Sequence, residues 1–443
     1  MKKKGIRNAI WTLGAIVLIN LSLKASSQGA ICPLAQDYVL VAKSNDSRNR
    51  PLYSPSILRL SSGRLVISYT EARKKKNNGI NIQIILTSDD GGQSWEKRSE
   101  QKAAEQGRIF EAKGTLYYIA TGPGLPICKS TDNGNTWSDP VLLTNKGKVW
   151  QQTAANVWYA NGNVYLEMDL RKKKINAWGA SEKAPVLLRG KLGKDLTDST
   201  NWAFSSILDF ADILPSFREN KPDINYFGLP FYTQCYPNRN YITPNRSFSP
   251  MGWAEGNVIQ ILDKKHYWYD KNGRTFHIFL RSLTGMTNYG TMCKVVENDD
   301  GTMTTLLESV PSGKNILFLP IPGGHNRFHI LYDTTTKTYW LLSNQSTDSM
   351  TKADLLENDR HDLAFGERNR LVLHFSKNMI DWCFAGLVSI GKTQKEARSY
   401  ASMDFDGNDI VILSRSGDNN AFSAHETNMI TFHRVKNFRK LIY

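Results

Sequence analysis

Several short segments of this sequence carry side chains that can transfer protons. Glu255 lies within the largely apolar segment Trp253–Gln260, where an unpaired carboxylate is costly. His325, in the segment GGHNRFH, and His425 have imidazoles whose ordinary pKa allows acid or base chemistry near neutral pH. These three residues are candidates for proton transfer, and a structural role is the alternative for each histidine.

Polar segments elsewhere in the chain carry groups that suit carbohydrate binding. Trp150–Asn156 contains Gln152, whose amide can bond sugar hydroxyl groups, Arg327 follows His325 in the same polar segment, and Asp418 lies in the sequence SGDNN. Acidic turn residues can also hold a cation, but no calcium-loop or histidine-ligand spacing occurs. We therefore predict neither a metal ion nor a cofactor.

The elements that position these groups are predicted to be β-strands. Short alternating or apolar runs bounded by Gly, Asn, Asp and Ser recur along the chain, for example SILRL at 56–60, RLVISY at 64–69 and IQIIL at 82–86. No stretch shows a helical period of 3.6 residues that is long enough to indicate a helix. The sequence therefore predicts an all-β protein.

An eight-residue turn motif is repeated. Ser88–Trp95 (SDDGGQSW) and Ser130–Trp137 (STDNGNTW) match at every fixed position and lie 42 residues apart, which is the length of one four-stranded blade. The Asp can accept turn N–H groups, the Gly supplies a positive φ, and the Trp can pack between neighbouring sheets. Degraded copies occur at Asp198–Trp202 and Ser376–Trp382.

These turns resemble the Asp-boxes of the sialidase (neuraminidase) superfamily, and the resemblance extends over roughly residues 38–435. It implies a six-bladed β-propeller with four-stranded antiparallel blades and an insertion rich in Pro, Tyr and Asn at about 210–250. The blades are expected to begin near Tyr53, Gly107, Trp150, Gly252, Ile316 and Ala397. We expect Met429–His433 to close the ring by pairing with the first blade.

The resemblance also implies roles for individual residues. Sialidases use a Tyr nucleophile activated by a Glu, three Arg that bind the substrate carboxylate, and an Asp acid/base. The segment SYASMDFDG resembles their nucleophile segment, so Tyr400 is the expected nucleophile and Glu255 the activating carboxylate. Arg281 resembles the second carboxylate-binding Arg, and Arg368 the third, with Arg370 as its alternative. A guanidinium matches a carboxylate because it donates two parallel hydrogen bonds.

The first predicted blade departs from this pattern in two places. Ser54 stands where the family has its first Arg, and Arg50 or Arg59 are substitutes that the motif does not select. The loop that normally supplies the Asp acid/base has no carboxylate before Asp89, so Glu71 is the nearest candidate acid. These departures indicate a different acidic sugar, a different acid or lost catalysis.

The N-terminus reads as a cleavable secretion signal over residues 1–27, with a basic start, an apolar run over 9–23 and small residues before the expected cleavage near Ser27. Residues 28–443 are then expected to form one propeller domain, secreted or periplasmic. A membrane anchor is the alternative, although it needs about 20 apolar residues. Lipid attachment at Cys32 is a further alternative.

Charge and cysteine content limit the partners. The formal charge of +15 falls to about +10 without residues 1–27, which favours an anionic glycan as partner, with a solvated basic surface as the alternative. Nucleic-acid binding is disfavoured because no helix-based reader or single-strand module is present. The five cysteines show no Cys-x-x-Cys pair, so neither a zinc site nor a disulfide framework is indicated.

Two classes of function follow. The first is an exo-acting glycoside hydrolase of the sialidase type that removes a terminal acidic sugar. The second is a propeller without that chemistry, either a polysaccharide lyase that uses Tyr and His or a glycan-binding module. The fold alone does not choose between them.

Overall fold

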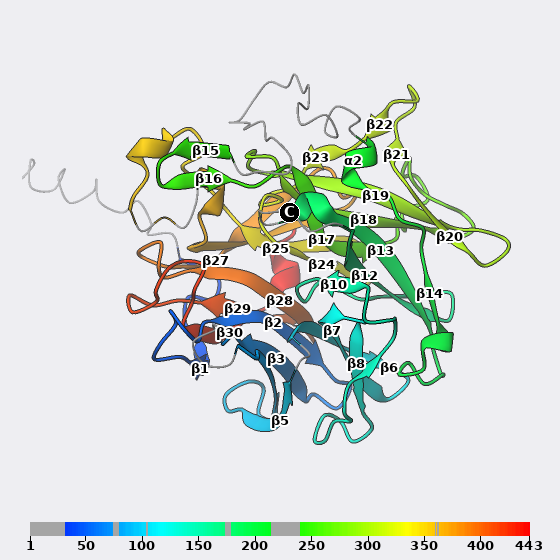
Figure 1. The fold of residues 1–443 in the computed structure, drawn as a ribbon, viewed down its shortest axis with the longest axis horizontal. Coiled ribbons are helices and arrows are strands. Elements are labelled where there is room, and N and C mark those ends of the chain that lie inside the picture. Colours follow the sequence, from blue (N-terminus) through cyan, green and yellow to red (C-terminus); the bar gives the residue numbers. More distant parts are fainter. Residues whose placement is uncertain are drawn as a thin grey trace, which may run out of the picture. The chain divides into compact units, whose positions relative to one another are not determined.

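Short apolar runs separated by turns fold into antiparallel strands along the chain (Figure 1). The computed structural model describes residues 32–73, 79–102, 105–172, 179–213, 240–358, 360 and 363–443. The predicted leader and residues 214–239 of the predicted insertion lie outside the described residues. The described residues from Leu34 to Tyr443 belong to one compact unit. No described helix has the length and apolar character needed to cross a membrane.

Three sheets contain four antiparallel strands each. The first consists of β2 (Leu52–Arg59), β3 (Leu65–Glu71), β4 (Ile82–Ser88) and β5 (Glu96–Lys102). The second consists of β24 (His329–Asp333), β25 (Thr338–Asn344), β26 (Arg370–Ser376) and β27 (Cys383–Ile390). The third consists of β28 (Arg398–Asp406), β29 (Asp409–Ser416), β30 (Met429–Val435) and β1 (Val39–Lys43).

Two larger sheets complete the set. A five-stranded sheet consists of β17 (Gly252–Ile259), β18 (Thr275–Leu283), β19 (Tyr289–Glu297), β20 (Met303–Leu306) and β23 (Phe318–Pro320). A nine-stranded sheet consists of β6 (Glu105–Ala112), β7 (Thr115–Pro123), β8 (Pro126–Ser130), β9 (Val141–Leu142), β10 (Val149–Gln151), β11 (Trp158–Ala160), β12 (Asn163–Arg171), β13 (Lys183–Lys191) and β14 (Trp202–Phe204).

The remaining elements are short. Two hairpins pair β15 (Asn240–Thr243) with β16 (Arg246–Phe248) and β21 (Glu308–Ser309) with β22 (Asn315–Ile316). The helical segments are α2 (Phe210–Ile213), η2 (Ala180–Glu182), η3 (Ser199–Asn201), η4 (Ala353–Leu355), η5 (Ala364–Gly366) and η6 (Phe438–Leu441).

The strands confirm the predicted all-β fold with a propeller-like arrangement of sheets, but the prediction of six separate four-stranded blades is corrected. Trp150 of β10 pairs both with Gly122 of β7 and with Leu170 of β12, so that the meanders β6–β9 and β11–β14 merge into one sheet. In the five-stranded sheet, β19 pairs both with β20 and with the additional strand β23.

The predicted closure of the ring is also corrected. The segment Met429–His433 lies in β30, which pairs with β29 and with the N-terminal strand β1 rather than with a strand of the first sheet. The N-terminal segment therefore supplies the outermost strand of the last sheet. The first strand of that sheet, β28, lies against β2 (Figure 1).

The two intact repeat motifs fold as predicted. Asp90 Oδ1 accepts hydrogen bonds from the backbone N–H groups of Gln93 and Ser94, and Asp132 Oδ1 accepts one from Thr136. Gly91, Gly92 and Gly134 have φ values of 74°, 95° and 86°. Trp95 packs edge-on against Phe432 of the last sheet, which fixes two neighbouring sheets against each other.

The strands β2, β6, β17, β24 and β28, each the first of its meander along the chain, are here called the first strands. Side-chain hydrogen bonds to the backbone connect them with one another and with residues 152–157 in a closed circuit. The contacts are Ser402 Oγ to Pro55 O at 2.7 Å, Ile109 N to Ser56 Oγ at 3.1 Å, Arg108 Nη1 to Asn156 O at 2.7 Å, Val258 N to Asn156 Oδ1 at 2.8 Å, Ile330 N to Asn257 Oδ1 at 3.0 Å and Met403 N to His329 Nδ1 at 2.9 Å. A cavity of about 100 Å³ lies among these strands. The circuit fixes the first strands relative to one another, and these strands carry the candidate site.

Candidate active site

Four first strands contain a β-bulge whose central residue has a positive φ. These residues are Ser54, Gln106, Glu255 and Tyr400, with φ values of 47°, 53°, 61° and 50°, and each lies at a register shift in its strand. A positive φ at a residue other than glycine costs about 1–3 kcal/mol and persists only where the surroundings enforce it. Bulges redirect side chains next to active sites, so Tyr400 and Glu255, two of the three predicted catalytic residues, occupy positions of that kind.

Two buried carboxyl groups hold the bulge that carries Glu255. Asp169 Oδ2 accepts a hydrogen bond from Glu255 N at 3.0 Å, and Glu167 Oε2 accepts one from Gly256 N at 2.9 Å. A Cβ at Gly256 would lie 2.5 Å from the Ile278 side chain and 3.0 Å from the Glu167 carboxyl group. This position therefore needs glycine because of the close approach.

The side chains of Tyr400 and Glu255 meet at Arg281 of β18. Arg281 Nη1 donates to the Tyr400 hydroxyl at 2.7 Å and lies 3.3 Å from Glu255 Oε2. Its Nε donates to His325 O at 2.9 Å. All of these side chains are buried, so the contacts form in a setting where a charge-assisted hydrogen bond is strong.

Two further guanidinium groups lie over the Tyr400 ring. The Cζ atoms of Arg368 and Arg415 are each 5.1 Å from the ring centroid, and Arg415 Cζ is also 4.2 Å from the centroid of Tyr53. Arg368 is 4% exposed, and its Nε and Nη1 have no hydrogen-bond partner among the described residues. Unpaired buried donors of a cation are costly, which makes this guanidinium suited to an anionic ligand.

Burial and like charges act together on the groups around this cluster. Burial, with the nearby Arg281 and Arg368 charges, lowers the pKa of His325 to about 3, so the imidazole is neutral at ordinary pH. Burial lowers the pKa of Arg415 to about 10. Burial raises the pKa of Asp169 to about 6 and that of Glu167 well above its ordinary value. The pair below Glu255 therefore retains a proton under mildly acidic conditions.

The structure brings several predicted residues to this cluster. Gln152 bonds the Glu167 carboxylate, Arg327 bonds Ala401 O and Ser402 Oγ next to Tyr400, and the His425 ring lies 5.7 Å from the Tyr53 ring. Of these, Gln152 Nε2 and the two Nη atoms of Arg327 bond other strands, whereas Arg327 Nε has no hydrogen-bond partner among the described residues.

Other predicted residues are engaged elsewhere. Arg370 forms an ion pair with Glu367, and Asp418 forms one with Lys43, so neither contacts the cluster. Glu71 pairs with Arg73 at 3.2 Å and with Arg50 at 3.9 Å. In the register of β2 and β3, Glu71 lies opposite Leu52, the residue that precedes Tyr53.

Sequence reasoning missed Arg415, Glu167 and Asp169. Arg415 is a buried cation in the otherwise apolar strand Asp409–Ser416, and the two acidic residues alternate on one face of β12. A charge in an apolar strand was the signal that selected Glu255, and the same rule applied to these strands finds all three residues.

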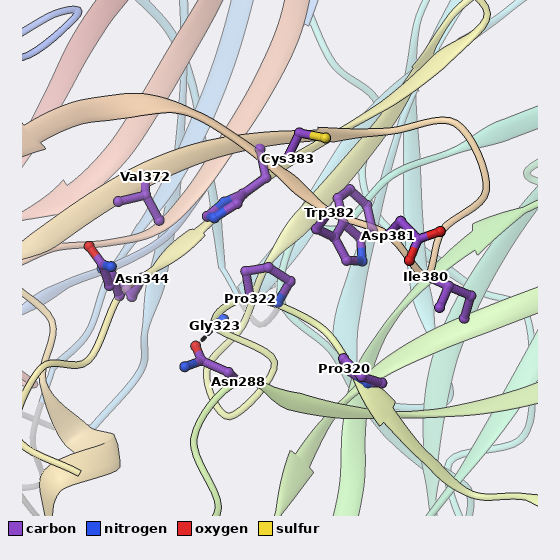
Figure 2. A pocket seen from close by; sticks show the side chains of 12 residues that line it. Asn288, Pro320, Pro322, Gly323, Asn344, Val372, Ile380, Asp381, Trp382 and Cys383 are labelled. Atoms are coloured by element: carbon purple, nitrogen blue, oxygen red, sulfur yellow. Dashed lines mark hydrogen bonds between the residues drawn. The ribbon is translucent and has the colours of Figure 1, made fainter. Parts of the chain in front are cut away.

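A separate cavity of about 630 Å³ lies between the five-stranded sheet and the sheet β24–β27 (Figure 2). Trp382, Pro320 and Pro322 lie along it, and Asn288 accepts a hydrogen bond from Gly323 N at 3.1 Å there. Tyr400 and Glu255 do not line it. Among the described residues, no group of three or more His, Cys, Asp or Glu side chains is placed to hold a metal ion.

No family model and no curated protein matches this chain. Among solved structures, it is similar to a Dyadobacter fermentans protein of unknown function, with 12% identity and a TM-score of 0.52 over 92% of this chain and 100% of that one. It is similar to the Hadza microbial sialidase Hz136, with 12% identity and a TM-score of 0.50 over 90% and 68%. It is also similar to Trypanosoma rangeli sialidase in complex with sialic acid, with 14% identity and a TM-score of 0.51 over 93% and 60%.

At these identities the likeness shows a shared fold. The chain thus has the β-propeller-like fold of these sialidases.

Proposed function

We propose that this protein is an exo-acting glycoside hydrolase of the sialidase-like type, which removes a terminal acidic sugar from a glycan. The observation that carries the proposal is the buried contact of Tyr400 and Glu255 with one guanidinium, that of Arg281. The resemblance of the sequence to sialidases selects the same three residues, and the shared fold supports that resemblance.

The proposed reaction has two steps. The Tyr400 oxygen attacks the anomeric carbon while the glycosidic bond breaks, the phenolic proton passes to Glu255, and an acid protonates the leaving oxygen. Water then attacks the anomeric carbon, the tyrosine–sugar bond breaks, and Glu255 returns the proton to Tyr400. The water supplies the hydroxyl of the released sugar and the proton that restores the acid.

Two features support an acidic sugar. Arg281 bonds the Tyr400 hydroxyl while Arg368 lies over the Tyr400 ring, and Arg368 has buried N–H groups without a partner among the described residues. A carboxylate accepts two hydrogen bonds from one guanidinium. Glu71 remains the candidate acid, and its ion pairs with Arg73 and Arg50 must open before it donates a proton.

The test is turnover of aryl sialosides and aryl uronides by the wild-type protein and by Tyr400→Phe. We expect the wild type to release the aryl group and Tyr400→Phe to lose activity on the order of a thousandfold, because the nucleophilic oxygen is absent. The control is Tyr267→Phe, an exposed tyrosine. Undiminished turnover by Tyr400→Phe would exclude the proposed nucleophile, and binding of glycans without any turnover would identify a binding module.

A specific contact favours a second function, an eliminating lyase that acts on uronate polymers. His425 and Tyr53 lie together with Arg415, burial lowers the pKa of His425 to about 4, and burial raises the pKa of Tyr53 to about 12. A neutral imidazole can accept the proton that elimination removes. Ultraviolet absorbance of an unsaturated product, lost in Tyr53→Phe, would establish this function instead.

We also propose that the protein is exported, since the first 27 residues have the pattern of a secretion signal. Mass spectrometry of the protein from its native host is expected to show a chain that begins near Gln28. A full-length chain in the cytoplasmic fraction would contradict export.

A further inference from the structure

Arg415 reaches the same tyrosine as Arg281 and Arg368 but comes from a different strand. It lies on β29 opposite Ser399 of β28, and its guanidinium lies over the rings of both Tyr400 and Tyr53. Tyr53 directly precedes Ser54, the residue that stands where the first carboxylate-binding Arg was expected. The buried serine leaves that place without a charge.

No carboxylate among the described residues lies within ion-pair distance of Arg415, although the Glu426 charge acts on it from further away. Arg415 is 3% exposed, its Nη2 donates to His425 O, and its Nε has no hydrogen-bond partner among the described residues. Within that part of the chain it makes no ion pair, and the Glu426 carboxylate bonds Ser423 Oγ and His425 instead. A cation buried in this way needs a counter-ion.

We propose that Arg415 replaces the missing first-sheet arginine and completes, with Arg281 and Arg368, a three-guanidinium site for the acidic group of the substrate. The inference rests on the proposed function, since it concerns the same cluster of residues. It makes Arg415 a specificity-determining residue, because a third cation distinguishes an acidic sugar from its neutral counterpart.

The experiment is calorimetric titration of the full chain with N-acetylneuraminic acid, D-glucuronic acid and D-glucose. We expect at least one acid to bind the wild type, and Arg415→Gln to weaken that binding about tenfold or more, as the loss of one charged hydrogen-bond partner predicts. Affinity for D-glucose should not change. The matched control is Arg434→Gln on the neighbouring strand β30, where Arg434 bonds Asp406 and Asp409 at the opposite end of β28 from Tyr400.

Equal acid affinity in Arg415→Gln and wild type would overturn the proposal, as would a wild type that binds neither acid more tightly than D-glucose. The result separates the two proposals. Acid binding that depends on Arg415, without turnover of any glycoside, contradicts the hydrolase only. Turnover with the same KM in Arg415→Gln contradicts the role of Arg415 only.

A rescue variant excludes a purely structural role. In Ser54→Arg/Arg415→Gln, a guanidinium returns from the first sheet, and we expect it to restore acid binding. A packing defect caused by the loss of the Arg415 contact with Tyr53 would not be repaired in this way. If Arg415→Gln fails to fold, Arg415→Lys keeps the charge but not the paired donors and should bind acids more weakly than the wild type.

Discussion

At the scale of single residues, the Tyr400 hydroxyl and the Glu255 carboxylate share the Arg281 guanidinium, so a substitution of either one alters the hydrogen bonding of a buried charge as well as a proposed catalytic group. The site holds Arg281, Arg368 and Arg415 around one tyrosine, and the Glu255 carboxylate pairs with Arg281. A substitution that keeps size and hydrogen bonding while removing charge therefore gives the clearest result.

Glu255→Gln is such a substitution. The amide oxygen can still accept from Arg281, so the protein should stay folded, while kcat on an aryl glycoside should fall about 10²–10⁴-fold because the proton acceptor is lost. Steady-state kinetics and thermal unfolding measure the two effects.

Glu297→Gln is the matched control. Glu297 accepts hydrogen bonds from Tyr165 and Arg189 at 2.9 and 2.7 Å, so it also belongs to a group of one Glu, one Tyr and one Arg, but this group lies outside the bulges. It should lower stability and leave kcat unchanged. If both variants lost activity equally, the loss would report on folding and not on catalysis.

At the scale of elements, the bulge in β17 determines where Glu255 points. Gly256→Ala tests this, because the added methyl group would meet Ile278 and the Glu167 carboxyl group. We expect kcat to fall about a hundredfold through displacement of Glu255 and the free energy of unfolding to fall by about 1–3 kcal/mol. Kinetics and urea unfolding provide the two measurements.

Gly147→Ala is the control, since a Cβ there meets only the Asn145 side chain at 3.2 Å. It should change neither quantity appreciably. Full activity in Gly256→Ala would show that the bulge does not need the close approach of Glu167.

The elements differ in how far sequence predicts them. The turn motif at Ser88–Trp95 was predictable because each of its residues performs a local task that the structure retains, such as the carboxylate of Asp90 on two backbone N–H groups. The bulge at Glu255 was not predictable. Its left-handed backbone is enforced by Glu167 and Asp169, which lie far away in the sequence, and local propensity does not report such contacts.

At the scale of the whole molecule, the family resemblance selected residues that the fold brings together from three sheets. Tyr400, Arg281 and Arg368 meet although more than a hundred residues separate the first two. Arg370 was a poor candidate for a physical reason. It lies two residues after Arg368, and its side chain pairs with Glu367 instead of reaching Tyr400. The local rule that selected Glu255, a charge in a largely apolar strand, also finds Arg415, but no local pattern connects Arg415 with Ser54 in another sheet, on which its proposed role depends.

Whole-molecule stability is expected to depend on pH through buried histidines. Burial lowers the pKa of three of them, that of His325 to about 3 and those of His374 and His433 to about 4. A histidine with a lowered native pKa contributes stability above its unfolded value near 6.5, and that contribution is lost as the pH falls towards 4. Asp404 acts in the opposite sense, because burial raises its pKa to about 6, and its contribution is lost as the pH rises through 6.

Two single substitutions separate these opposing contributions. The His433 ring bonds Ala35 O and Thr431 Oγ at 2.8 and 2.9 Å. His433→Gln can replace these bonds without a titrating group. The rise in the free energy of unfolding from pH 4 to 6.5 should therefore become smaller by on the order of 3 kcal/mol. Asp404→Asn should make the same rise steeper, because the group that loses stability with increasing pH is gone. Urea unfolding at about pH 4, 5 and 6.5, which spans the interval of the predicted rise, measures both slopes. A shift of both slopes in one direction would contradict the assignment of opposite signs to these two buried groups.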